Sequence, residues 1–467
     1  MRKAPTTRMA AINWQQLIFG MLLALDVSAY SQPPIPKFQS FQPITLAGYT
    51  QLAQPPSQLQ SRVNPMLPND PYAEQNRKIQ ERAGMAPGPV MPQRQIPDEV
   101  HQDLQEQRSM VSSNRTTGLQ FFQNDLTQFL SLNPDGFSVT KAVYLSESAY
   151  YGNPPAYAEF ESSIKQGAEL VKQIMKREGL NEKDNLAINY AIQKLYSQEN
   201  EYYDSTTGRQ YLVKRLQYDF DDFLGEKDWT KMFVTKLLHT GAGQCHSLPL
   251  FYLCIAEQLN AKAYLSLSPN HSLIQYLDNR GNRYNFETTN GNLVSQTWLV
   301  GSNFVTSEAL KNKTYLDTLS SRRLYAQCLG DLLLSYLTKA GHYDGFSNVI
   351  MNKLLSIDST NITALMERAN LCYLIYQKEL EAARNPPKSE YGRYPNLNSA
   401  YKQYEASQQK VDQTGFQSMP KEAYQAWLKS LGDQKQLQQN QAEQQRMERE
   451  IKRLRSRPSK LINNSKG

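Results

Sequence analysis

Between Gly241 and Gly291 the apolar residues change from a helical to an alternating period, and this change restricts the fold more than any other sequence feature. Ser247 to Gln258 is a nearly continuous apolar stretch, which predicts a buried helix. Three predicted strands follow, at residues 263–267, 271–277 and 283–289. A helix followed by an antiparallel meander of strands indicates an α+β fold.

Cys245 lies at the start of the predicted helix, directly after a glycine-rich turn. Pro249 supports this placement, because proline is tolerated where the helix N–H groups have no partner. The positive end of the helix dipole favours the thiolate of such a cysteine, and nearby backbone N–H groups can stabilise an oxyanion. Gln244 is a candidate supporting residue beside the thiol. Cys254 lies about 2.5 turns further along on the opposite face, so we expect it to be buried as a small apolar residue.

His271 begins the second predicted strand, and Glu287 lies on the third. A three-residue loop between these strands would place the two side chains directly opposite each other, and a five-residue loop would make them diagonal neighbours. Both loops put them on one face of the sheet, whereas a loop of two or four residues would separate them. Asn285 shares the face of Glu287 and is the substitute for orienting the imidazole.

The order of these residues resembles the transglutaminase-like branch of the papain-type cysteine protease superfamily. The resemblance is carried by Gly243-Gln-Cys245, the apolar helix, His271 and Phe286-Glu-Thr-Thr289. It implies a papain/transglutaminase-like core with Cys245 as nucleophile, His271 as base and Glu287 as the orienting acid. The expected activity is thiol-dependent acyl transfer on a peptide or amide substrate, by a hydrolase (peptidase or amidase) or a transglutaminase.

Two departures from the family pattern leave a second interpretation open. The acid is Glu287 rather than the usual aspartate, and Ser272-Leu273 replaces the aromatic residue usually found beside the histidine. Several members of this superfamily have lost catalysis. The alternative is therefore a catalytically inactive transglutaminase-like module that binds a protein partner in an envelope complex.

The sequence predicts no cofactor and no metal. The nearby soft ligands are Cys245, His246 and His271, and they lack the spacing of a zinc site. The chain also lacks a phosphate-binding glycine loop and a G-x-S-x-G elbow.

Residues 320–430 have the pattern of paired helices and resemble degenerate tetratricopeptide repeats. Asp358 to Asn361 matches the turn that closes such a repeat, and residues 385–396 would be an insertion between the two helices of the next unit. The small-and-large spacing of that repeat is found at Ser347, Met351 and Leu354, and again at Ala400, Tyr404, Ser407 and Asp412. The resemblance implies a protein partner, and about two repeats must pack on a neighbouring domain to be stable.

The N-terminal region carries export and linker patterns. Arg2, Lys3 and Arg8 precede the apolar run Leu17–Leu25, and small residues follow it, which is typical of a secretory signal peptide. The alternative is an uncleaved amphipathic N-terminus. Thirteen of the 24 prolines then lie between residues 32 and 99, a density that indicates a disordered or extended linker. The alternative for this N-terminal linker is a tether that docks a protein partner. We therefore expect a periplasmic or secreted protein with no membrane span after cleavage.

The positive charge belongs to the ends of the chain. The formal net charge is +7, but residues 1–29 carry +2 and residues 446–467 carry +6, which leaves −1 for the rest. This distribution argues against nucleic acid as a partner, because the folded part has no basic excess. The predicted organisation is a signal peptide (1–29), a Pro/Gln-rich linker (30–98), a helical lead-in with a transglutaminase-like domain (100–318, core 228–300), repeat-like helices (319–432) and a basic helical or disordered tail (433–467).

Apolar stripes at helical spacing predict three helices in the lead-in, at residues 157–175, 186–195 and 229–238, so residues 100–240 should be mostly helical. Residues 436–457 are rich in Gln, Glu and Arg and predict a solvated helical tail, with a short coiled coil through Met447, Ile451 and Leu454 as the alternative.

Overall fold

The structure is a computed structural model, which describes residues 116–455 apart from residues 153, 155, 206, 207, 418, 420, 432 and 433. The predicted signal peptide and the Pro/Gln-rich linker lie outside the described residues. Within the described part of the chain, no helix combines the length and the apolar character that crossing a bilayer requires.

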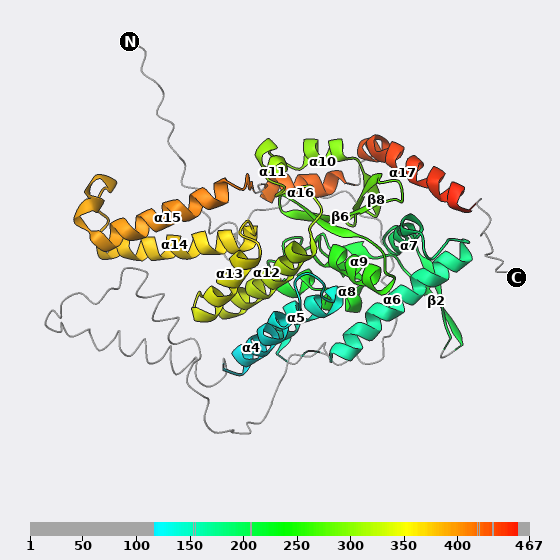
Figure 1. The fold of residues 1–467 in the computed structure, drawn as a ribbon, viewed down its shortest axis with the longest axis horizontal. Coiled ribbons are helices and arrows are strands. Elements are labelled where there is room, and N and C mark those ends of the chain that lie inside the picture. The colour runs from blue at the N-terminus through cyan, green and yellow to red at the C-terminus, as the bar shows by residue number, and fades with distance from the viewer. Residues whose placement is uncertain are drawn as a thin grey trace, which may run out of the picture.

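The region predicted to be mostly helical contains α4 (Thr116–Leu130), α5 (Val139–Tyr151), α6 (Tyr157–Arg177), α7 (Asn185–Ser197) and α8 (Val234–Thr240). Helices α4, α5 and α6 run along one side of the molecule, while α7 and α8 lie closer to the sheet and to helix α9 at Ser247–Gln258 (Figure 1). The apolar stripes predicted a helix at 157–175 and another at 186–195, and α6 and α7 confirm both. A hairpin of β1 (Asn200–Asp204) and β2 (Arg209–Val213) interrupts the helices, and the sequence analysis had not predicted it.

The predicted helix at 229–238 is divided in two. A short 3-10 helix, η3 (Trp229–Met232), precedes α8, and the backbone is extended at Phe233 between them. The reason lies in the carboxylate of Glu147, which accepts hydrogen bonds from the backbone N–H groups of Val234 at 2.7 Å and Thr235 at 2.9 Å. These contacts cap a new helix N-terminus at this point.

The helix-and-meander prediction is confirmed. Helix α9 (Ser247–Gln258) is followed by a four-stranded antiparallel sheet, whose strands are β5 (Tyr264–Ser268), β6 (His271–Leu277), β7 (Arg283–Glu287) and β8 (Asn292–Val294). A short parallel pair, β3 (Gln217–Tyr218) and β4 (Ala242–Gly243), leads the chain into α9. The fold is thus α+β.

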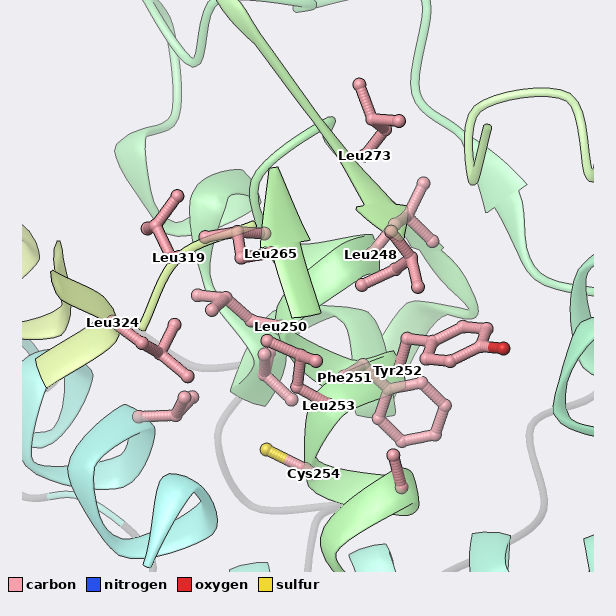
Figure 2. Packing of buried hydrophobic residues seen from close by; sticks show 14 of the residues in the cluster. Leu248, Leu250, Phe251, Tyr252, Leu253, Cys254, Leu265, Leu273, Leu319 and Leu324 are labelled. Carbon is pink, nitrogen blue, oxygen red and sulfur yellow. The ribbon is translucent and has the colours of Figure 1, made fainter. Parts of the chain in front are cut away.

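Helix α9 is surrounded by other elements and forms the centre of the hydrophobic core. Figure 2 shows its leucines and aromatic rings directed toward the strands and helices around them, with Cys254 further along the same helix. Cys254 is fully buried, as predicted. On the sheet, Phe286 packs against Tyr196 of α7 and Tyr252 of α9. One face of the meander is therefore fixed against α7 and α9.

The C-terminal half is helical and begins with consecutive helices that pack on one another. The elements are α10 (Gln296–Ser302), α11 (Ser307–Lys311), α12 (Ser321–Ala340), α13 (Gly345–Ile357), α14 (Ile362–Ala382), η4 (Lys388–Arg393), α15 (Pro395–Asp412), α16 (Lys421–Ser430) and α17 (Gln434–Arg455). Helices α14 and α15 lie side by side and form an arm that extends from the body (Figure 1). The segment predicted as an insertion lies between them. Cys328 is buried in α12 and Cys372 is partly buried in α14, and both are free thiols.

The last two described helices return to the body. The sequence predicted a solvated tail from residue 436, but α17 packs Met447 and Ile451 into the core and places the Arg446 guanidinium over the Tyr284 ring at 4.3 Å. Arg280 at the β6–β7 turn also pairs with Glu450. A sparse apolar stripe with flanking cations is enough to attach this polar helix to the sheet.

The turn before β8 provides a test of the packing. Gly291 has a φ of 72°, and an added Cβ would lie 2.7 Å from the backbone oxygen of Tyr196. Gly281 has a φ of 82°, but a Cβ there would meet open space. We expect Gly291→Ala to lower the free energy of unfolding by about 3 kcal/mol and Gly281→Ala by about 1 kcal/mol, because only the first adds a clash to the backbone strain. Urea unfolding measures both, and equal losses would contradict this packing.

Candidate functional site

Cys245 is the middle residue of the three-residue connection between β4 and α9. Gly241 ends α8 in the left-handed conformation, with a φ of 69°, and turns the chain into β4. The hydroxyl of Ser272 on β6 then donates to the backbone oxygen of Cys245 at 2.5 Å. The thiol is thereby held beside the start of β6, and its Sγ lies 3.7 Å from the backbone oxygen of Asn270.

His271 and Glu287 meet on the face of the sheet opposite the one that packs on α9. The loop has five residues, because Leu277 pairs with Arg283, so His271 and Glu287 are diagonal neighbours. The imidazole Nε2 donates to the Glu287 Oε2 at 2.7 Å, and both side chains are completely buried. The other carboxylate oxygen accepts the backbone N–H of Thr289 at 3.0 Å. The Nδ1 atom of His271 is left to face the thiol.

The charges of Cys245 and His271 support each other. Burial lowers the pKa of His271, but the Glu287 carboxylate and the neighbouring thiolate outweigh burial and raise it to about 10. Burial raises the pKa of Cys245, but hydrogen bonding and positive charge from His271 bring it below its ordinary value. Both shifts favour the thiolate beside an imidazolium over the neutral thiol beside a neutral imidazole.

Two aromatic side chains of α16 complete the site. The Tyr424 hydroxyl donates to Cys245 Sγ at 3.2 Å and lies 3.4 Å from His271 Nδ1. The Trp427 ring packs edge-on against the imidazole, with a centroid separation of 4.7 Å. The sequence analysis missed both residues. The apolar positions 424, 427, 428 and 431 form a helical stripe in a polar region, which signals a buried face but not its partner.

Gln244 and Asn285 have partners away from the Cys245–His271 pair. The Gln244 side-chain amide donates to the backbone oxygens of Asp219 and Asp222, at 3.0 and 2.6 Å, and so braces the loop after β3. Asn285 accepts a hydrogen bond from the Gln275 side chain at 2.8 Å. Although Asn285 shares the face of Glu287, the strand register places it beside Gln275 instead of His271.

His246 is a second charged histidine next to the thiol. Its Nε2 lies 3.1 Å from Asp331 Oδ2 on α12. Burial lowers the pKa of His246, but the Asp331 carboxylate outweighs it and raises the pKa to about 9. The positive charge of His246 also helps to lower the pKa of Cys245. This ion pair connects the start of α9 to the C-terminal helices.

The site has the side chains for thiol chemistry and the described residues offer no alternative metal centre. Among them, no group of three or more His, Cys, Asp or Glu side chains is arranged to hold a metal ion. Comparisons of the chain with protein-family models, curated proteins and solved structures find no match. The interpretation of the site therefore depends on its own geometry.

The Glu287 carboxylate is predicted to control the titration of the thiol. In Glu287→Gln the imidazole loses the charge that keeps it protonated, so the pKa of Cys245 should rise by about 1 to 2 pH units. Thiolate absorbance near 240 nm, measured against the Cys245→Ser background, follows this titration. Asn285→Ser is the matched control on the same strand and face and should leave the thiol unchanged. A Cys245 titration unaffected by Glu287→Gln would refute the assignment.

The His246–Asp331 pair predicts a pH-dependent stability. Since the pKa of His246 is raised from 6.5 to about 9 on folding, the pair stabilises fully below pH 6.5 and loses its effect as the pH rises toward 9. Asp331→Asn should thus lower the free energy of unfolding by about 2 kcal/mol at pH 6 and by clearly less at pH 9. Asp135→Asn, which breaks an exposed pair with Arg322, should have little effect at either pH. A loss from Asp331→Asn that stays constant with pH would exclude this linkage.

Proposed function

We propose that this protein is a thiol-dependent acyl-transfer enzyme with a papain/transglutaminase-like core, which acts on peptide or amide carbonyl groups. The observation that carries the proposal is the buried chain of contacts from Glu287 through His271 to the Cys245 thiol. Opposing pKa shifts in a paired thiol and imidazole are what a cysteine nucleophile needs. The direction of the imidazole supports it as well, since Nε2 is held by the carboxylate while Nδ1 faces the sulfur.

The proposed reaction has two half-reactions. The Cys245 thiolate attacks the carbonyl carbon, and backbone N–H groups near Cys245 stabilise the oxyanion. The His271 imidazolium then donates its Nδ1 proton to the leaving amine as the C–N bond breaks, which leaves a thioester on Cys245. In the second half-reaction water or an amine attacks the thioester, and neutral His271 accepts the proton. Glu287 keeps the imidazole in the correct orientation throughout. Water gives hydrolysis, and an amine gives cross-linking.

A non-catalytic binding module remains the second candidate function, and one observation favours it. Cys245 retains only 8% of its surface exposure and Tyr424 is hydrogen-bonded to its sulfur, so the thiol lies beneath α16. In this alternative the paired helices α12–α15, which resemble tetratricopeptide repeats, bind a protein partner. The two candidates differ in whether Cys245 accepts an acyl group.

An activated ester distinguishes them. We expect p-nitrophenyl acetate to acetylate Cys245, with a burst of p-nitrophenolate and an acetyl adduct that mass spectrometry locates on this residue. Cys245→Ala should abolish the burst, and His271→Ala should slow it by about 10²- to 10⁴-fold, because it removes the imidazolium that lowers the pKa of the thiol. Cys254→Ala, a buried thiol on the far face of α9, is the matched control.

An unchanged burst in Cys245→Ala would rule out the enzyme. Addition of a tagged primary amine to the acylated protein then separates the two classes of second half-reaction. Incorporation of the tag into product indicates transfer, and release of the free acid alone indicates hydrolysis.

A further inference from the structure

The Cys245–His271 site is closed by a segment that lies more than 130 residues further along the chain. We propose that α16 is an intramolecular lid that keeps this site inactive until the helix is displaced. Tyr424 is the residue that occupies the reacting position. The inference rests on the proposed thiol chemistry and adds its regulation.

The position of the Tyr424 hydroxyl excludes a substrate from the thiol. Nucleophilic attack needs the carbonyl carbon at about 3–3.5 Å from the sulfur. The Tyr424 oxygen already lies 3.2 Å from Cys245 Sγ and 3.4 Å from His271 Nδ1, on the side of the imidazole that faces the sulfur. A substrate and Tyr424 cannot both be there, so the activated ester acetylates Cys245 only while α16 is transiently displaced.

The lid is stabilised by the charges it covers. An imidazolium Nδ1–H of His271 can donate to the Tyr424 oxygen while the Tyr424 hydroxyl donates to the Cys245 thiolate. One neutral hydroxyl thereby adds a hydrogen bond to each of the two buried charges. The closed site is thus a hydrogen-bonded arrangement that a substrate's polar atoms would have to replace.

Side-chain packing holds α16 in place. Trp427 lies between His271 and Trp298 of α10, with its ring stacked on Trp298 at 6.0 Å and its indole N–H 3.3 Å from the Ser302 hydroxyl. Leu428 is also buried on this face.

Both ends of the segment are anchored by asparagine side chains. Asn270, in the turn before β6, donates to the backbone oxygen of Met419 at 2.8 Å, and Asn290 donates to that of Leu431 at 3.1 Å. The lid is therefore attached to the two turns that border the site.

The opposite face of α16 is exposed, which allows the helix to move without loss of the central core. Glu422, Gln425, Ala426 and Lys429 are all exposed. The buried stripe of α16 borders the same hydrophobic cluster as α9, but α9 packs directly on α5, α6, α7 and the sheet, so local opening of α16 need not unfold them. A surface helix that buries only one stripe of side chains can move as a lid, whereas a helix at the centre of the core cannot.

Alkylation of Cys245 by iodoacetamide, followed by peptide mass spectrometry, tests the lid in the full chain. We expect Trp427→Ala to raise the labelling rate about 100-fold and Leu428→Ala about 10-fold, because each loosens the buried face of α16. Tyr325→Phe is the matched control: its buried hydroxyl bonds the Phe129 backbone far from the site, and its rate should equal that of the wild type. Hydrogen exchange of residues 422–431 reports lid opening separately.

Two results would overturn the lid. In the first, α16 exchanges faster in both variants but Cys245 is labelled at the wild-type rate. In the second, α16 exchange is unchanged in both variants. The wild type gives a test without substitution: as urea is added, Cys245 should be labelled before the core thiols Cys254 and Cys328. Simultaneous labelling of all three would also overturn the proposal.

If α16 is a lid but Cys245 is an ordinary thiol, the labelling experiment would give a different result. Labelling would still accelerate in Trp427→Ala and Leu428→Ala, but it would be negligible at pH 6 and rise only with the titration of an ordinary thiol. In that case α16 covers Cys245 but the thiolate–imidazolium pair is absent.

Discussion

The buried hydrogen bond between His271 and Glu287 is the interaction on which the rest of the site depends. Burial of a charged imidazole and a carboxylate is costly unless each has further partners. The structure supplies them: the Thr289 backbone N–H on the carboxylate, and the thiol with its bound Tyr424 hydroxyl on the Nδ1 side. Removal of any one of these groups leaves a buried charge less satisfied. Because the pair is charged and buried, the site around it is polar, and one of the polar groups it binds comes from α16.

Much of the local structure around the site can be predicted from the sequence, because the helix and strands there are specified by residues close together in the chain. The apolar run from Ser247 to Gln258 coincides with α9, and the strand predicted at residues 271–277 between two turn signals coincides with β6. Because the loop between the two strands has an odd number of residues, His271 and Glu287 lie on one face of the sheet. The sequence left the loop length open between three and five residues, and the five-residue loop in the structure makes the pair diagonal.

Other parts of the site depend on contacts that no local pattern specifies. Periodicity cannot show that Asn285 bonds Gln275, because that partner is chosen by the exact strand register. The contact between Tyr424 and Cys245 joins residues 179 positions apart. The same holds for α17: its apolar positions suggested a short coiled coil or a free tail, and only tertiary packing places Met447 in the core. Long-range packing accounts for what the sequence analysis missed.

The closed site holds a charged imidazole, and nitrogen NMR of His271 in the wild-type protein measures that charge. The ¹⁵N shifts of Nδ1 and Nε2 distinguish an imidazolium from a neutral ring, and His271→Gln identifies the signal. We predict that both nitrogens stay protonated at pH 8 and that deprotonation begins only near pH 10. A ring that becomes neutral near the ordinary pKa of 6.5 would contradict the account.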